Sequence, residues 1–231
     1  MTDFAFPPDT LAFLADLRAN NHKAWFEANR DRYQSAYVEP AMAFVEAAGP
    51  VLDEIVPGIN AEPRILGSIF RINQNRMYVR DRPPYKDHLD LWFWEGERKA
   101  AVSGLFVRVT PDWVGVGAGA HHFDKDRFGT YRAALGRPGP AKELVDAVER
   151  VERAGYPVGG EKYARTPKVA LGDPAAERLL RHNALFMHHE LPRELAHDRQ
   201  LIPILAEHWR AMAPVHRWLT AHVQGARSRV P

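Results

Sequence analysis

The sequence predicts an α+β protein, with N-terminal helices, a central antiparallel β-meander and C-terminal helices packed on one face of the sheet. Apolar residues recur at helical spacing over residues 9–56 and again over 123–223, whereas 64–120 show the two-residue alternation of strands. Short turns between the alternating segments favour antiparallel neighbours. No long linker, repeat or low-complexity segment interrupts the chain, so we expect residues 1–231 to form a single domain.

The N-terminal part is expected to contain two or three helices. The first should follow its N-cap, Asp9, and end at Asn20. The second carries an aromatic stripe that runs from Trp25 to Tyr33, which indicates core packing rather than a cofactor site. Pro40 suits the first turn of the third helix.

The sheet is expected to begin with an isoleucine-rich central strand over residues 65–72. Three alternating strands should follow at 89–94, 105–109 and 114–119, with their apolar sets facing the helices. The opposite face would carry Trp92, Trp94, Phe106 and three glycines. Glycine on a sheet face leaves room for a close neighbour, and we expect a packed helix or a tryptophan there rather than a ligand.

The C-terminal part is expected to be helical. Helical patterns cover residues 124–135, 141–154 and 174–181. A last helix or pair of helices should cover 199–223, with a break near Pro214. The stretch that starts at Gly159 is expected to be irregular.

Composition indicates an ordinary soluble protein. The chain has 231 residues, of which 45% are hydrophobic and 26% charged, close to the average of globular proteins. It contains no cysteine, which excludes a disulfide framework, a thiolate zinc site and a cysteine nucleophile. The N-terminus shows no signal-peptide pattern, and no apolar stretch reaches the roughly 18 residues of a membrane span. We therefore expect a cytoplasmic protein without membrane contact.

Positive charge is concentrated between Arg64 and Lys86. This stretch holds six basic residues and one acidic residue, although the whole chain has a net charge of only +2. Local charge of this kind often serves an anion, because guanidinium groups bind phosphate or carboxylate in bidentate fashion while lysine and tyrosine add further contacts. The candidate ligand-binding residues are Arg71, Arg80, Arg82, Tyr85 and Lys86, joined by Arg132 if its helix packs beside the loop.

The alternative interpretation of this basic stretch is a solvated loop whose charges pair with nearby acids such as Asp81, Asp87 and Asp90.

Other chemistries have weaker support. The histidine doublets at 121–122 and 188–189 chelate a metal poorly, because adjacent side chains diverge. The glycines at 115–119 lack the spacing of a dinucleotide site, and neither Ser68 nor Ser103 lies in a nucleophile-elbow motif. We expect no metal and no cofactor, and assign no catalytic residue.

Three functions follow as hypotheses. The first is binding of a small anionic ligand in a basic pocket, with or without catalysis. The second is a non-catalytic interaction module that binds an acidic protein partner. The third is single-stranded nucleic-acid binding, because tyrosines and tryptophans are interspersed with the basic residues. The net negative charge of the rest of the chain argues against this third function. The sequence decides neither whether a reaction occurs nor the oligomeric state.

A series of short motifs extends over nearly the whole chain. They are Phe13-Leu14, NNHKAWF at 20–26, Asn29-Arg30, Tyr33, Pro40, Phe70-Arg71, DRPPYK at 81–86, Tyr131-Arg132, RTPK at 165–168, Asp173-Pro174 and LLR at 179–181. In this order they resemble the uncharacterised family called domain of unknown function 2461. The chain departs from the family pattern at 74–75 and 77–78, which hold Gln-Asn and Met-Tyr. The resemblance implies one mostly α+β domain and brings no established activity, substrate or cofactor.

Overall fold

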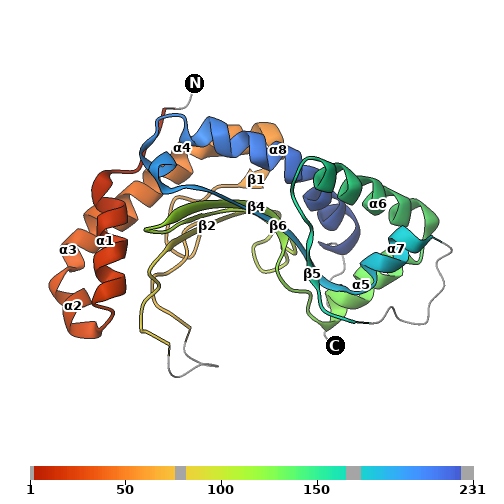
Figure 1. Ribbon diagram of the computed structural model, residues 1–231, viewed down its shortest axis with the longest axis horizontal. Coiled ribbons are helices and arrows are strands. Elements are labelled where there is room, and N and C mark those ends of the chain that lie inside the picture. The colour runs from red at the N-terminus through yellow and green to blue at the C-terminus, as the bar shows by residue number, and fades with distance from the viewer. Residues whose placement is uncertain (1–2, 76–81, 165–172, 225–231) are drawn as a thin grey trace. The chain divides into compact units, whose positions relative to one another are not determined.

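The computed structural model of the protein is an α+β fold with a six-stranded antiparallel sheet (Figure 1). It describes residues 3–75, 82–164 and 173–224. The strand order is β1-β2-β3-β4-β6-β5. The chain forms two compact units, one of Met1–Phe93, Phe106–Val116 and Glu190–Glu207, the other of Trp94–Leu105, Gly117–His189 and His208–Pro231. The single domain over residues 1–231 stays a prediction.

The helices of the first unit follow one another closely. They are α1 (Pro8–Ala19), α2 (Lys23–Ala28), α3 (Arg30–Tyr33), a π-helical turn (Gln34–Val38) and α4 (Glu39–Ile55). Helix α1 begins at Pro8, one residue before the expected N-cap Asp9, because proline fits the first turn of a helix. The His22 side chain caps α2 by accepting a hydrogen bond from the backbone N–H of Trp25 at 3.3 Å.

Aromatic rings fill the core beneath these helices, as the sequence predicted. The ring of Tyr37 is fully buried and lies 5.2 Å from Tyr33 and 6.5 Å from Phe13, centroid to centroid. Phe26 and Tyr33 are also in contact, at 5.2 Å. Ring pairs at such distances add about 0.5–1.5 kcal/mol each to the free energy gained by burial. The stripe is therefore core packing.

The predicted meander is confirmed. Strands β2 (Leu89–Glu95), β3 (Gly104–Val109) and β4 (Trp113–Ala120) are neighbours in chain order, and the short β1 (Ile59–Asn60) lies beyond β2. The turn between β3 and β4 is fixed by Thr110, whose hydroxyl accepts hydrogen bonds from the N–H groups of Asp112 and Trp113. Leu89, Leu91 and Phe93 of β2 are buried, and so are Leu105, Val107 and Val109 of β3. This burial of alternate residues is why the two-residue alternation identified both strands.

The prediction of a regular strand at residues 65–72 was wrong, because this segment makes only isolated bridges. Leu66 has a φ of 66°, and its N–H donates to the carbonyl of Ile69 at 2.9 Å, which closes a tight turn where the strand was expected to begin. Beyond the turn, residues 68–74 and 84–92 are joined by a few separate backbone hydrogen bonds rather than by a continuous ladder. The N–H of Phe70 donates to Asp90 at 3.0 Å, and that of Lys86 donates to Ile72 at 2.8 Å. The two segments are thus the arms of an irregular hairpin, which brings the backbone of Arg71 close to that of Lys86.

The second unit contains helices and the remaining strands. Their bounds are α5 (Lys125–Leu135), α6 (Pro138–Arg153), β5 (Gly159–Glu161), α7 (Pro174–Leu179) and β6 (His182–Pro192). A 3₁₀ turn (Arg193–His197), α8 (Leu201–Leu219) and a π-helical turn (Thr220–Gln224) follow, α8 and β6 being shared between the units. Helix α8 runs through Pro214 without the expected break.

The C-terminal part, expected to consist of helices and an irregular stretch from Gly159, also contains two strands, β5 and β6. Strand β6 pairs with β4 through a very close approach at Gly119. A Cβ atom there would lie 2.2 Å from the carbonyl oxygen of Leu185, and Gly119 has a φ of 116°. The room that this glycine leaves is therefore occupied by the backbone of a neighbouring strand, not by a helix or a tryptophan as expected.

Candidate functional site

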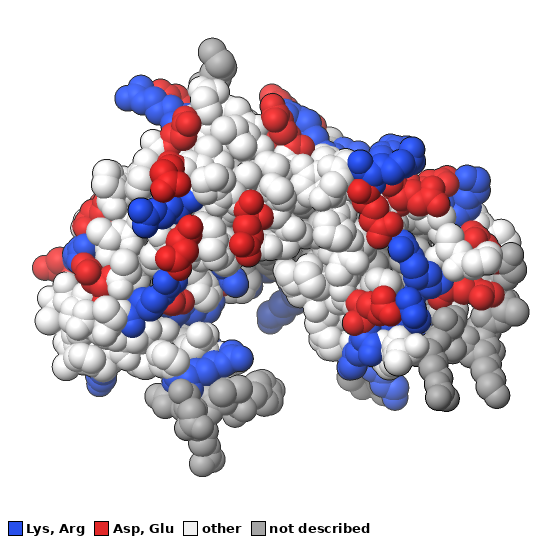
Figure 2. All heavy atoms as spheres, in the orientation of Figure 1, with Lys and Arg blue, Asp and Glu red and all other residues white. Residues whose placement is uncertain are grey.

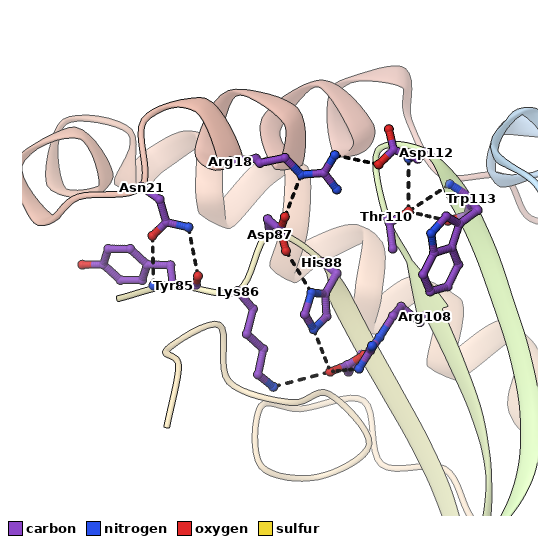
Figure 3. Close-up of polar contacts among 11 residues, drawn as sticks. Arg18, Asn21, Tyr85, Lys86, Asp87, His88, Arg108, Thr110, Asp112 and Trp113 are labelled. Atoms are coloured by element: carbon purple, nitrogen blue, oxygen red, sulfur yellow. Dashed lines mark hydrogen bonds and ion pairs between the residues drawn. The ribbon is translucent and has the colours of Figure 1, made fainter. Parts of the chain in front are cut away.

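The side chain of Asn21 holds the backbone of Tyr85 in place (Figure 3). Its Nδ2 donates to the Tyr85 carbonyl at 2.9 Å, and its Oδ1 accepts from the Tyr85 N–H at 3.0 Å. The ring of Phe26 stacks on that of Tyr85 at 4.1 Å between centroids. The amide thus satisfies both backbone groups of one residue, as a neighbouring strand would. This contact fixes the start of the segment that carries Lys86.

Asp90, on β2, is the centre of a cationic cluster. Its carboxylate accepts two hydrogen bonds from Arg108 on β3, from Nε at 2.6 Å and from Nη2 at 3.1 Å. The Nζ of Lys86 lies 3.5 Å away and the Nε2 of His88 lies 3.3 Å away. Burial acts to raise the pKa of Asp90, but the bonds from His88 and Arg108 outweigh it and hold this pKa well below its usual range. Asp90 is therefore a fixed negative charge among several cations.

Lys86 is mostly buried, with 15% of its side chain exposed, as are Asp90 and His88. Its Nζ lies 4.9 Å from the centre of the Phe70 ring. Burial lowers the pKa of Lys86 and, although Asp90 acts in the opposite direction, Arg108 and Arg71 lower it further, so the net change is downward. Burial is thus the main cause of the lowered pKa of Lys86, and Asp90 offsets it only in part.

Arg18, at the end of α1, extends the network towards the turn between β3 and β4 (Figure 3). Its Nε contacts Asp87 and its Nη1 contacts Asp112, both at 2.6 Å. The Nδ1 of His88 lies 3.1 Å from Asp87. His88 therefore has a carboxylate at each ring nitrogen.

Tyr85 precedes Lys86 in the chain, but its ring points away from the cluster and stacks on Phe26 of α2 (Figure 3). Tyr85 is 7% exposed, and burial raises the pKa of its hydroxyl, with Glu27 acting in the same direction, so the phenol stays protonated at neutral pH. Arg71 is exposed on the arm at 68–74, and the exposed Arg82 precedes the arm at 84–92. This part of the first unit can thus offer guanidinium and ammonium donors to an oxyanion.

A family model described as "Conserved hypothetical protein (DUF2461)" matches residues 9–218. The chain belongs to the DUF2461 family. Comparisons with curated proteins and with solved structures gave no match. The match includes the residues of the cationic cluster. It also includes the motif at 20–26, which contains Asn21 and Phe26, and the motif at 81–86, which contains Tyr85. In this DUF2461 chain, the N-terminal and central motifs are therefore linked by direct contacts, Asn21 and Phe26 with Tyr85.

The predicted binding residues of the DUF2461 chain do not all lie in one described place. Arg71 and Lys86 are neighbours in the first unit, whereas Arg132 lies in the second unit, with its guanidinium 5.6 Å from the centre of the Phe128 ring. Arg80 lies outside the described residues. The convergence of Arg132 on the other two stays a prediction. Lys86 pairs with Asp90. This contact agrees with the alternative interpretation, in which the charges of the basic stretch pair with nearby acids.

Sequence reasoning missed most of the residues that arrange the cluster. They are Arg18, Asn21, His88 and Arg108, whereas Asp90 was named as an acid that pairs with the basic stretch. One signal was present, because Asp90 and Arg108 are opposite charges at outward positions of two successive apolar strands, where cross-strand pairs form. The contacts of Arg18 and Asn21 join residues more than 60 positions apart, which no local pattern indicates.

The second unit contains a buried polar triplet on β2, α8 and the segment before β3. The Oγ of Ser103 lies 2.8 Å from the Nδ1 of His216, whose Nε2 lies 3.0 Å from the Oε2 of Glu95. The residue types match a hydrolase triad. Ser103 is only 1% exposed and His216 is fully buried, so the serine hydroxyl does not meet solvent or a substrate in this conformation. The triplet is thus a buried polar network that links β2, α8 and the segment before β3.

The histidine doublets lie in aromatic surroundings. His121 lies 4.6 Å from Phe186, and His189 stacks on His208 at 4.8 Å, centroid to centroid. Among residues 3–75, 82–164 and 173–224, no group of three or more histidine, aspartate and glutamate side chains is arranged to hold a metal ion. Within the same ranges, no helix is both long and apolar enough to cross a bilayer.

The contact between Asn21 and Tyr85 gives a first prediction. Replacing Asn21 with alanine leaves two part-buried backbone groups without their partners, so we expect the free energy of unfolding to fall by about 2 kcal/mol. Urea denaturation followed by circular dichroism measures this. The matched control is Asn20→Ala, which removes a single exposed bond to Asp16 and should cost less than about 1 kcal/mol. Equal losses in the two variants would contradict the structural role of Asn21.

Proposed function

We propose that the first unit binds a small anionic ligand, bearing phosphate or carboxylate, beside Lys86, Arg71 and Arg108. One observation carries this proposal. Lys86 and Arg108 share a single carboxylate, Asp90, which is also in contact with His88. His88 has a second carboxylate in Asp87, so the excess of positive charge lies at Lys86, Arg108 and the nearby Arg71, three cations beside the carboxylate of Asp90. An oxyanion would compensate that excess.

Asp90 serves the proposed site as an internal counter-ion. Without it, Lys86 and Arg108 would repel each other across a partly desolvated space, at a cost in folding free energy. With it, the donors are held in position before a ligand arrives, so little conformational entropy is lost on binding. The exposed Arg71 and Arg82 would then add bidentate contacts, with Arg80 and Arg132 as further candidates.

Charge distribution favours a small ligand over the two alternatives. On the face shown in Figure 2, basic and acidic side chains are interspersed over the described residues rather than gathered into one basic surface. An acidic protein partner or a single-stranded nucleic acid would make contact over a wider area and would need a continuous basic patch or groove. A small oxyanion needs only a few converging donors.

Anion titration tests the proposal. We expect inorganic phosphate, or a small dicarboxylate, to bind the wild type and to bind Arg71→Ala at least about tenfold more weakly, a loss of about 1.4 kcal/mol. Isothermal titration calorimetry measures both affinities. The control is Arg30→Ala, which removes another exposed arginine of the same unit that pairs with Glu27. Absent binding, or equal weakening by both substitutions, would overturn the proposal.

A further inference from the structure

We propose that Lys86 forms an imine with the carbonyl group of a small ligand that also bears an anionic group, a 2-oxo acid being the simplest class. This inference rests on the proposed function, because the anion site would bring the ligand to the lysine. It adds a covalent step and a substrate class to simple anion binding.

The surroundings of Lys86 are those of a nucleophilic amine. The side chain is 15% exposed, its Nζ lies 4.9 Å from the centre of the Phe70 ring, and Arg108 is bound to the same carboxylate. Burial is the largest effect and lowers the pKa of Lys86, Asp90 raises it, and Arg108 and Arg71 lower it by less. The net change is downward, so a larger share of its amine is neutral at a given pH than for a solvated lysine. Desolvation and a neighbouring cation are the two ways in which proteins activate lysine for imine formation.

A second lysine gives the contrast. Lys142 is a helical surface residue whose Nζ lies 2.7 Å from Asp146, and its side chain is 75% exposed. The hydrogen bond from Asp146 raises the pKa of Lys142. Each of these lysines lies near one aspartate, yet burial is the largest effect on the pKa of Lys86 and only a minor one on that of Lys142. The two should therefore differ strongly in reactivity.

The geometry also selects the ligand class. In a 2-oxo acid the carboxylate is bonded directly to the carbonyl carbon. A carboxylate bound by Arg71 or Arg108 would thus hold that carbon close to Lys86, because the backbone bond from Lys86 to Ile72 places Arg71 on the neighbouring arm. The arginines would also stabilise the oxyanion that forms when the amine attacks.

The step balances without any other reactant. The neutral amine of Lys86 attacks the carbonyl carbon, the carbonyl electron pair moves to oxygen, and a proton passes from nitrogen to that oxygen to give a carbinolamine. The carbon–oxygen bond then breaks, water leaves with a second proton from nitrogen, and a carbon–nitrogen double bond forms. Amine and ketone become imine and water, and nothing is oxidised or reduced.

Reductive trapping tests this inference. Folded full-length protein is incubated with pyruvate and cyanoborohydride, which delivers hydride to an imine, and the modified lysines are located by peptide mass spectrometry. We expect Lys86 to be labelled at least about tenfold faster than Lys142. Inorganic phosphate should slow the labelling of Lys86 but not that of Lys142. Arg71→Ala should slow it as well, and Lys86→Arg, which keeps the charge beside Asp90, should abolish it.

The outcomes separate the two proposals. If phosphate binds with the affinities predicted above but Lys86 is labelled no faster than Lys142, the imine is overturned and anion binding stands. If phosphate neither binds nor protects Lys86, the anion site itself is overturned, and the imine proposal that rests on it falls as well. Circular dichroism of Lys86→Arg shows whether a loss of labelling reflects the missing amine or a misfolded chain.

Discussion

Replacing Gly119 with alanine is expected to lower the free energy of unfolding by more than about 4 kcal/mol, or to prevent folding of the second unit. The new Cβ would lie 2.2 Å from the carbonyl oxygen of Leu185 and 2.7 Å from the Cα of Phe186, and both are backbone atoms that cannot turn aside. The φ of 116° adds strain that only glycine avoids. Strands β4 and β6 would have to separate there, with loss of their pairing.

Urea denaturation of Gly119→Ala and Gly129→Ala measures this effect against a matched control. Gly129 lies within α5, and a Cβ at that position would meet no atom within 4 Å. Alanine should therefore stabilise that helix by about 0.5–1 kcal/mol, because it loses less conformational entropy than glycine on folding. A Gly119→Ala protein with an unchanged denaturation midpoint would show that β4 and β6 do not approach as described.

Replacing His216 with alanine should have the second large effect, a loss of about 3 kcal/mol of stability at neutral pH. The imidazole is fully buried and lies 2.8 Å from the Ser103 Oγ and 3.0 Å from the Glu95 carboxylate. Its removal leaves a cavity, a buried hydroxyl and a partly buried carboxylate without their partner. The matched control is His222→Ala, whose imidazole pairs with the exposed Glu143 and should contribute about 0–1 kcal/mol.

The same variant should change how stability depends on pH. Contact with His216 lowers the pKa of Glu95 in the folded protein below its usual value, against the effect of burial. A carboxyl group with a lowered folded pKa contributes stability above its unfolded pKa, about 4.3 for glutamate, and loses it as the pH falls towards the folded value. The stability of the wild type should therefore fall more steeply than that of His216→Ala in this acidic range. Urea denaturation of both proteins at several pH values from 6 down to about 3 measures this dependence. If the free energy of unfolding falls equally steeply with pH in the two proteins, this role of Glu95 is contradicted.

The secondary structure was largely predictable wherever one face of an element is buried. Alternation identified β2, β3 and β4, and helical spacing identified α1, α4, α5 and α6, because a buried face imposes its period on the sequence. Strand β6 was missed for a physical reason. Its residues Ala184, Leu185 and Met187 are buried and Phe186 is half-buried, so the strand has no regular alternation, and a short apolar run of this kind also fits a helix.

The hairpin arm at residues 68–74 shows a second limit. Its isoleucines predicted a strand, but the positive φ of Leu66 and the hydrogen bond from the Glu62 N–H to the Ser68 Oγ at 2.9 Å impose a tight turn. Leucine rarely adopts this backbone conformation, so nothing in its identity indicated the turn. The irregular pairing that follows depends on contacts with residues 84–92, which only the folded chain brings near.

The candidate site was predictable in its charge and not in its arrangement. A local excess of basic residues showed where cations gather, and Arg71 and Lys86 are indeed neighbours. Asp90 supplies the carboxylate that Lys86 shares with Arg108, and Asn21 anchors Tyr85. The contacts of Asp90 with Arg108 and of Asn21 with Tyr85 depend on tertiary structure. Charge counts along a sequence do not show which opposite charges will meet.

The ends of the sheet bear on the behaviour of this protein at high concentration. The outermost strands, β1 and β5, contain two and three residues. An edge this short offers few unpaired amide and carbonyl groups to a second chain, so it is a poor template for intermolecular β-pairing. Aggregation and amyloid growth through these edges are thereby disfavoured, a protection that results from strand length alone.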